Sequence, residues 1–403
     1  MTHTHRRESL LAAVALAALA LAACDGAGTD AVDQSTNTDS AMFTASDGGT
    51  PADDLALAPN GVTTLRVHYP AGTQGMTVRG AALPLDWNAG ISLTVGADDT
   101  WQYVLTLPDT VAQVEWKPLL DDSTWSRGPN YIARRGETLD VYPHFHATAG
   151  SVSQLFTAFH STLLGNNRVV WLYLPASYGE NTRATYPVLY MHDGQNLFTT
   201  LAPWGGWHVG EALDAASEDG SIRDVIVVAP ENAGSKRLWE YTPSFDSSEG
   251  DGGGGDLYVR MLVEELKPQV DAMLRTKFER TSTGVLGSSL GGLISAYAGV
   301  KKANVFGIVG AMSPATWWDN DMILAQVQGM TSPRPERVYV DYGDGADGGE
   351  ETVKLVSAYL ALGYAEGTSF HSYIQPGGEH QENFWASRFP GAMKFLFGRG
   401  PGR

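Results

Sequence analysis

The stretch "STGVLGSSLGGLISAYAG", residues 282 to 299, joins an apolar run typical of a buried strand to an apolar run typical of a buried helix. At the junction, "GSSLG" fits the pattern G-x-S-x-G with Ser289 at its centre. A strand that turns this sharply into a helix needs glycine beside the serine, because side chains there would collide with the neighbouring strand and helix. Ser289 is therefore predicted to be a catalytic nucleophile at a helix N-terminus, where a developing oxyanion is favoured.

The surrounding sequence indicates an α/β fold. Near-continuous apolar strands are expected at 169–176, 187–193, 224–232, 283–289, 306–314, 337–343 and 369–378, and helices at 256–275, 290–301 and 351–363. Such strands, separated by helices, predict a mostly parallel, doubly wound sheet that is covered on both faces. Ligands of such sheets bind at the carboxyl ends of the strands, and the candidate site residues all lie there.

A nucleophilic serine needs a base and an acid that orients the base, and in sheets of this type they follow the serine in the order acid, then histidine. Of the two downstream histidines, His371 lies inside a strand, whereas His380 follows one, so His380 is the predicted base. The loop "DGADGGEE", residues 344–351, supplies the acid. Asp347 is the first choice, because it can turn back toward His380, and Asp344 is the second.

The same acidic loop raises the alternative of a calcium site. Asp341, Asp344 and Asp347 are spaced by three residues, however, which does not match an EF-hand. No other His, Cys and carboxylate spacing is convincing for a metal. We therefore expect neither a metal nor another cofactor.

An oxyanion hole requires two backbone donors. The amide of Leu290 directly follows the nucleophile and is the first. The second is expected from the turn "HDGQNLF", residues 192–198, which follows a strand and offers the amides of Gly194 and Gln195.

Six motifs in order resemble an esterase family of α/β-hydrolases that includes esterase D, feruloyl esterases, enterochelin esterases and mycolyl transferases. They are "YPVLYMHDGQNLF", "LWEYTPSF", "VEELKPQVDAMLRTK", "TGVLGSSLGGL", "FGIVGAMSPATWW" and "PGGEHQENFW". The resemblance covers roughly residues 155 to 397 and implies an esterase domain at 150–398, with Ser289 as nucleophile, His380 as base and an oxyanion donor near Gln195. Ala346 stands where many members carry the acid, so the alternatives are a triad completed one residue later and a Ser-His dyad.

The N-terminus is typical of an export signal. Two arginines precede the apolar run "LLAAVALAALALAAC", which is too short for a comfortable membrane span. Its end, "LAAC", resembles the bacterial lipobox, in which the cysteine, here Cys24, is lipidated. We expect a signal peptide at 1–24, a flexible linker at 25–60 and a lipid anchor on a bacterial membrane, periplasmic or at the cell surface; a plain cleaved signal is the alternative.

Composition and charge limit the partners. The 403 residues carry 45 acidic and 27 basic side chains, a net charge of −18, so nucleic acid is not an expected partner. Cys24 is the only cysteine, which excludes an intramolecular disulfide.

Residues 62–146 predict a small all-β sandwich, because short β-branched and aromatic runs alternate with Gly, Pro, Asn and Asp turns. Segments "VRGAALPLDW", "VEWKPLL" and "STWSRGPN" resemble starch-binding carbohydrate modules. The resemblance implies that Trp87, Lys117 and Trp125 bind sugar, since indole faces suit pyranose rings. The alternative is that these tryptophans fill the core.

Four tryptophans, Trp204, Trp207, Trp317 and Trp318, are expected near the site, either shaping a pocket for an aryl acyl group or a sugar, or packing in the core. The glycine-rich run 249–256 predicts a flexible loop. The resemblance implies a secreted, lipid-anchored serine carboxylesterase that acts on carbohydrate-linked feruloyl or acetyl esters. A siderophore esterase and a non-catalytic carbohydrate-binding lipoprotein are the alternatives.

Overall fold

The structure is a computed structural model that describes residues 61–198, 202 and 205–400. The expected signal peptide at 1–24, Cys24, the linker at 25–60 and Trp204 lie outside the described residues. In the part of the chain that is described, no helix is both long enough and apolar enough to cross a membrane.

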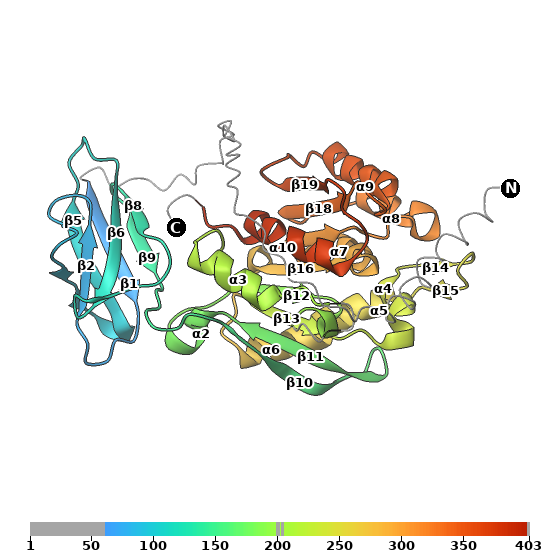
Figure 1. The fold of residues 1–403 in the computed structure, drawn as a ribbon, viewed down its shortest axis with the longest axis horizontal. Coiled ribbons are helices and arrows are strands. Elements are labelled where there is room, and N and C mark those ends of the chain that lie inside the picture. The colour runs from blue at the N-terminus through green and yellow to red at the C-terminus, as the bar shows by residue number, and fades with distance from the viewer. Residues whose placement is uncertain (1–60, 199–201, 203–204, 401–403) are drawn as a thin grey trace, which may run out of the picture. The chain divides into compact units, whose positions relative to one another are not determined.

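The larger part of the fold is built on an eight-stranded sheet in the order β10-β11-β13-β12-β16-β17-β18-β19 (Figure 1). Its strands are β10 (Ser151–Ser161), β11 (Asn166–Leu174), β12 (Val188–Met191), β13 (Ile226–Pro230), β16 (Thr283–Ser288), β17 (Ile308–Met312), β18 (Arg337–Gly343) and β19 (Phe370–Gln375). From β13 to β19 all neighbours are parallel, as predicted, whereas β10 and β11 pair antiparallel. The sequence analysis missed β10, because its outward residues are polar and break the apolar run.

Alternate residues of the strands enter two separate cores, as a side-chain period of two requires. In β12, Val188 and Tyr190 join one core and Leu189 and Met191 join the other. The first core is closed by helices of the segment 255–301 and by α8 and α9, and the second by α3 and α10. These helices are α3 (Val209–Glu218), α5 (Gly255–Arg260), η4 (Met261–Leu266), α6 (Lys267–Met273), α7 (Leu290–Lys301), α8 (Trp318–Gln328), α9 (Gly349–Ala361) and α10 (Glu382–Phe397).

Short elements complete this part: α2 (Ala176–Glu180), η2 (Gly194–Asn196), η3 (Gly234–Lys236), α4 (Arg237–Tyr241), β14 (Phe245–Asp246), β15 (Asp251–Gly252) and η5 (Arg280–Ser282). The run 249–256, expected to form a flexible loop, includes β15 and the first two residues of α5, so part of it is regular secondary structure. Its glycines allow close packing: a Cβ on Gly252 would lie 2.4 Å from the Ser244 carbonyl oxygen, and one on Gly254 would lie 2.5 Å from the Trp239 ring.

Residues 62–141 form two further sheets that share one apolar core. One has the order β4-β5-β1-β9, and the other has the order β3-β2-β6-β7 with β8 paired to β6. The elements are β1 (Val62–His68), β2 (Met76–Gly80), β3 (Ile91–Ser92), β4 (Thr94–Val95), η1 (Ala97–Asp99), β5 (Thr100–Thr106), β6 (Gln113–Leu120), β7 (Thr124–Trp125), β8 (Tyr131–Arg134) and β9 (Thr138–Val141). Trp116 of β6 is fully buried between the two sheets, as expected of a sandwich.

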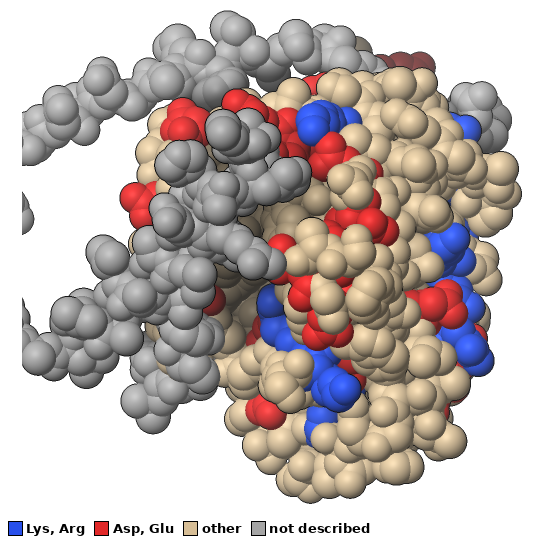
Figure 2. All heavy atoms as spheres, turned by 90° about the vertical axis from the view of Figure 1, so that its right-hand side faces the viewer, with Lys and Arg blue, Asp and Glu red and all other residues tan. Residues whose placement is uncertain are grey.

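The charge on the surface is mixed. On the face drawn in Figure 2, Lys and Arg side chains are interspersed with Asp and Glu and form no broad basic area.

Candidate active site

Ser289 occupies the sharp turn between β16 and α7. Its backbone has φ 59°, a left-handed conformation that non-glycine residues rarely adopt. A Cβ on Gly287 would lie 2.7 Å from the His192 ring and 2.9 Å from the Gly291 backbone, so only glycine fits before the serine. At Gly291 the nearest contact would be 3.4 Å, so the steric requirement there is weaker.

Ser289, His380 and Asp347 form one hydrogen-bonded chain. Ser289 Oγ lies 2.9 Å from His380 Nε2, and His380 Nδ1 lies 2.7 Å from Asp347 Oδ1. The three residues follow β16, β19 and β18, whose carboxyl ends meet at one edge of the sheet. Asp344, the second choice for the acid, is not in this chain, because its carboxylate accepts the Gly377 amide at 2.6 Å.

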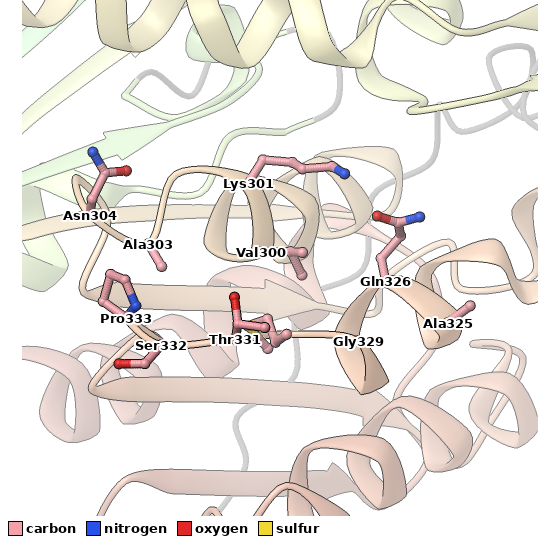
Figure 3. A pocket seen from close by; sticks show the side chains of 11 residues that line it. Val300, Lys301, Ala303, Asn304, Ala325, Gln326, Gly329, Thr331, Ser332 and Pro333 are labelled. Atoms are coloured by element: carbon pink, nitrogen blue, oxygen red, sulfur yellow. The ribbon is translucent and has the colours of Figure 1, made fainter.

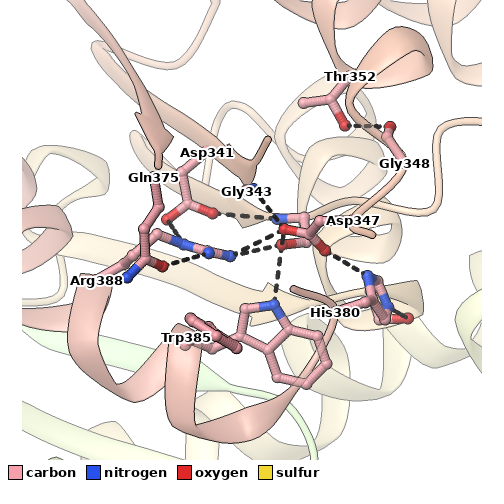
Figure 4. A network of polar contacts seen from close by, with 12 residues as sticks. Asp341, Gly343, Asp347, Gly348, Thr352, Gln375, His380, Trp385 and Arg388 are labelled. Carbon is pink, nitrogen blue, oxygen red and sulfur yellow. Dashed lines mark hydrogen bonds and ion pairs between the residues drawn. The ribbon is translucent and has the colours of Figure 1, made fainter. Parts of the chain in front are cut away.

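Ser313, directly after β17, bonds the Asp347 oxygen that faces away from His380. Figure 4 shows Trp385 and Arg388 on the same side of Asp347. Trp385 Nε1 and Arg388 Nη2 can only donate, and their hydrogen bonds of 2.9 and 2.6 Å occupy the lone pairs of Ser313 Oγ. The Ser313 proton is then left for Asp347 Oδ2, 2.7 Å away. The direction of this hydrogen bond is therefore set by two obligate donors.

Hydrogen-bond donors also determine which of Asp347 and His380 carries a proton. Asp347 Oδ2 accepts the Gly343 amide at 2.6 Å as well as the Ser313 hydroxyl, so this oxygen has no room for a proton. Burial alone would raise the pKa of the Asp347 carboxyl, but hydrogen bonds, first from His380 and then from Ser313, hold that pKa below its usual value. With Asp347 ionised, His380 donates from Nδ1, which leaves Nε2 to accept the Ser289 proton.

A second buried carboxylate, that of Asp341, shares Arg388 with Asp347. Asp341 Oδ2 is 3.1 Å from Arg388 Nε and accepts the Tyr339 hydroxyl at 2.9 Å. Arg388 also reaches Asp347, with 3.4 Å between Nη2 and Oδ2. Burial raises the pKa of Asp341 to about 6, against the opposing effect of Arg388. Sequence reasoning missed Ser313, Arg388 and the role of Asp341, although Trp385 belongs to the motif "PGGEHQENFW".

The predicted oxyanion donors lie at two helix starts. The Leu290 amide is in the first turn of α7, whose first four amides have no acceptor within the helix. Gly194 and Gln195 begin η2, and a Cβ on Gly194 would lie 2.2 Å from the Ala229 carbonyl oxygen, so only glycine allows this turn. We call residues 193–196 the oxyanion turn. Asp193 anchors this turn by pairing with Arg237 through two contacts of 2.8 Å.

His192 lies directly under the serine turn and was missed by the sequence analysis as a structural group. Its Nδ1 is 2.9 Å from the Tyr258 hydroxyl, and its Nε2 is 3.0 Å from Ser295 Oγ on α7. Burial lowers the pKa of His192 to about 4, so the imidazole is neutral near pH 7. The neutral ring therefore connects the residue that precedes the oxyanion turn to α7 through a hydrogen bond with Ser295.

The tryptophans predicted near the site divide into two groups. Trp318 is fully buried in the first core, and Trp207 is 4% exposed and packs on Trp385 and Phe389 in the second. A pocket role for these two is therefore wrong, because their rings are not accessible. Trp317 is 38% exposed and follows Ala315, whose amide donates to the Ser289 carbonyl oxygen, so it remains a candidate for substrate contact.

Two cavities differ in their relation to this site. One, of about 500 Å³, lies beside His380 and is lined by Gly205, Gly206, His208, Gln381, Glu382, Asn383 and Ala386. Asn196 Nδ2 donates to Glu382 Oε1 at 3.2 Å, which ties this wall to the oxyanion turn. Burial raises the pKa of Glu382.

The other cavity, of about 570 Å³, lies at the far end of α7, around Lys301 and Gln326 (Figure 3). Because a helix rises about 1.5 Å per residue, it is roughly 16 Å along α7 from the Ser289 turn. It therefore takes no part in the chemistry of Ser289.

The predicted sugar-binding residues of the β-rich region are only partly brought together. The rings of Trp87 and Trp125 lie 6.1 Å apart, and Arg79 stacks over Trp125 at 5.3 Å. Trp125 is 39% exposed. Lys117 instead donates to the Gly128 carbonyl oxygen at 2.5 Å, so its ammonium group already has an acceptor.

Metal binding finds no support in the side chains that the structure describes. Among them, no group of three or more His, Cys, Asp or Glu is arranged to hold a metal ion. The acidic loop is instead used by the backbone and by His380, through Asp344 and Asp347.

The comparisons with known proteins identify the family of the chain. The family described as "Putative esterase" matches residues 161–396, and the chain belongs to this family. The Bacillus subtilis protein YbbA, described as uncharacterized, is 28% identical over 251 residues, which are 58% of this chain and 94% of that protein. An endo-1,4-beta-xylanase/feruloyl esterase of Xylanibacter ruminicola is 25% identical over 241 residues, which are 59% of this chain but 30% of that relative.

Among solved structures, the enterobactin esterase of Shigella flexneri is similar with a TM-score of 0.51 and 17% identity. The match covers 83% of this chain and 92% of that one. At this identity it shows the fold alone, an α/β-hydrolase-like fold. The family description supports ester hydrolysis, and the relative from Xylanibacter ruminicola and the protein from Shigella flexneri are both named as esterases.

Proposed function

We propose that the protein is a serine carboxylesterase that works through an acyl-enzyme. The hydrogen-bonded chain Ser289–His380–Asp347 carries this proposal. Ser289 Oγ attacks the ester carbonyl while His380 Nε2 takes its proton, and Asp347 stabilises the imidazolium. His380 then protonates the leaving alcohol, and a water activated by His380 releases the acid.

The oxyanion of each tetrahedral intermediate would be stabilised by backbone amides. The Leu290 amide lies at the start of α7, and the turn at Gly194 and Gln195 supplies the second donor. The tight fit of Gly194 against Ala229 holds that turn in place before substrate binds.

The best-supported substrates are carbohydrate-linked esters such as feruloyl or acetyl groups. The cavity beside His380 has a mainly apolar lining that suits an aryl acyl group or the face of a sugar ring. Its carboxylate and two carboxamides, from Glu382, Gln381 and Asn383, suit sugar hydroxyl groups. The feruloyl esterase relative from Xylanibacter ruminicola supports the same class. The exposed Trp125 next to Trp87 favours a sugar contact in the β-rich region.

Hydrolysis of para-nitrophenyl acetate and methyl ferulate by wild type and Ser289→Ala tests the activity. We expect the substitution to lower kcat by about 10⁴-fold or more, because the nucleophile is removed. A fluorophosphonate probe should label Ser289 in the wild type only. Equal rates for the two proteins would contradict the proposal.

A siderophore esterase is the second candidate. It is favoured by the likeness to the enterobactin esterase, which covers 83% of this chain and so extends beyond the family match. Hydrolysis of a ferric catecholate trilactone faster than of any feruloylated or acetylated sugar would select this candidate.

A non-catalytic carbohydrate-binding protein is the third candidate. It requires retention on insoluble starch without turnover of any ester. Trp125→Ala should abolish that retention, and loss of retention with ester hydrolysis unchanged would instead assign the tryptophan to an accessory role.

The sequence pattern also supports export and lipid anchoring at Cys24. Metabolic labelling with palmitate of wild type and Cys24→Ser tests this proposal. Label in both proteins, or in neither, would contradict it.

A further inference from the structure

Arg388 and the two carboxylates that it contacts do not balance in charge. Arg388 contacts both Asp341 and Asp347, and all three are buried, with exposures of 3%, 0% and 3%. Two carboxylates and one guanidinium sum to one negative charge. When His380 holds the proton of Ser289, the imidazolium balances that charge.

In the described part of the chain, Asp341 makes no hydrogen bond or ion pair with Asp347 or His380, so its effect on them must be electrostatic or pass through its partners. It contacts Arg388, the Tyr339 hydroxyl and the Ser313 amide, at 3.1, 2.9 and 3.2 Å. Without the Asp341 charge, the guanidinium would cancel the negative charge that Asp347 presents to the imidazole. In a buried site such a cancellation is weakly screened by solvent.

We propose that Asp341 is a positioning residue of the esterase site, which through Arg388 keeps the net charge behind His380 negative and so stabilises the imidazolium that forms during catalysis. This inference rests on the proposed function. It assigns Arg388 to orient Asp347 and Asp341 to offset the charge that Arg388 brings.

The other charged and titratable groups around this cluster come from five segments. They are Tyr339 on β18, Tyr373 on β19, Glu382 on α10, Asp193 in the oxyanion turn and Arg237 on α4. Asp193 and Arg237 pair with each other, and Glu382 lies on the cavity side of His380.

The test is the pH dependence of kcat/KM for para-nitrophenyl acetate between pH 5 and 9. At low pH, kcat/KM should fall as His380 becomes protonated, and we call this fall the acid limb. Asp341→Asn should move the acid limb to lower pH by about 0.5 to 1 unit. It should also lower kcat by about threefold to tenfold. The double variant Asp341→Asn/Arg388→Gln restores one net negative charge and should return the limb toward its wild-type position.

The shape of the limb is a second readout. Because the pKa of Asp341 is raised to about 6, its protonation and that of His380 oppose each other, and the wild-type limb should be broader than a single ionisation. In Asp341→Asn the limb should become a single ionisation.

Glu240→Gln is the matched control, because Glu240 is another buried carboxylate paired with an arginine, Arg168, at 2.8 Å. It should leave the limb in place. Fluorophosphonate titration gives the active fraction of each variant, so partial unfolding does not alter the limb position. An unmoved limb in Asp341→Asn, or a double variant displaced further than the single one, would overturn the inference. If the wild type hydrolyses no ester, the proposed function fails instead.

Discussion

At the residue scale, the choice of the acid depends on one position in a loop. The family resemblance places the acid at position 346, but this position is Ala346, whose carbonyl oxygen accepts the His380 amide at 3.3 Å. The next residue, Asp347, turns its carboxylate to the His380 ring. The backbone at 346 and the side chain at 347 therefore hold the histidine together, which supports a triad over a dyad.

Asp347→Asn tests this assignment. An amide in place of the carboxylate favours the wrong tautomer of His380, so kcat should fall by roughly 10³- to 10⁴-fold. Asp344→Asn, three residues earlier in the same loop, should change kcat by less than about threefold, because the Asp344 carboxylate accepts the Gly377 amide and does not bond His380. Steady-state hydrolysis of para-nitrophenyl acetate measures both. Near-equal activity of Asp347→Asn and wild type would support a Ser-His dyad.

At the element scale, the site is assembled where strands end and helices begin. Ser289 at the start of α7 and the turn at η2 both depend on glycines that face backbone atoms, Gly287 and Gly194. These close approaches transmit the position of β13 to the oxyanion turn, since Gly194 lies against Ala229 of that strand. The geometry of the site is thus set by packing of elements.

Gly194→Ala tests this coupling. The added Cβ would lie 2.2 Å from the Ala229 carbonyl oxygen, so the turn must shift and kcat should fall by about 10²-fold or more. Gly391→Ala is the control, because its Cβ would meet nothing within 4 Å in the helix α10. It should raise the free energy of unfolding by roughly 0.5 to 1 kcal/mol with kcat unchanged. Urea unfolding and ester hydrolysis measure these effects, and unaltered kcat in Gly194→Ala would contradict the predicted role of the turn.

At the scale of the whole molecule, the buried side chain of His192 connects the central sheet to two helices. His192 is 2% exposed and joins the end of β12 to α7 and, through Tyr258, to α5. Protonation of an imidazole in this place lowers the stability of the fold, because burial disfavours the charged ring. The stability of the protein is therefore predicted to depend on pH through His192.

The folded state keeps the pKa of His192 at about 4, below its ordinary value. As the pH falls from 6.5 to 4, the unfolded chain binds a proton that the folded protein excludes, so the free energy of unfolding should fall by up to about 3 kcal/mol. Denaturant unfolding at several pH values should show this slope, and His192→Gln should reduce it. Tyr258→Phe removes one partner but keeps the imidazole buried, so it should retain the slope. An equal slope in His192→Gln would rule out this histidine as the cause.

Sequence reasoning reached the parts of the site that follow from local pattern. Ser289 is marked by its glycines and by the strand and helix around it, and His380 by its place after the last strand. Ser313 and Arg388 carry no such local mark, because their role arises only where α10 crosses the ends of β17 and β18. The same reason explains the tryptophans: exposure separates Trp317 from Trp318, and adjacent positions in sequence do not reveal it.

By itself the sequence determined the alternation of strands and helices, the serine turn and the order of nucleophile, acid and base, because these depend on side-chain period and on backbone sterics within a few residues. Only the tertiary structure decided that Asp347 rather than Asp344 faces His380, and that Arg388 and Asp341 lie behind it. The physical reason is that a carboxylate in a loop is oriented by donors from distant segments, and those donors meet only in the packed fold.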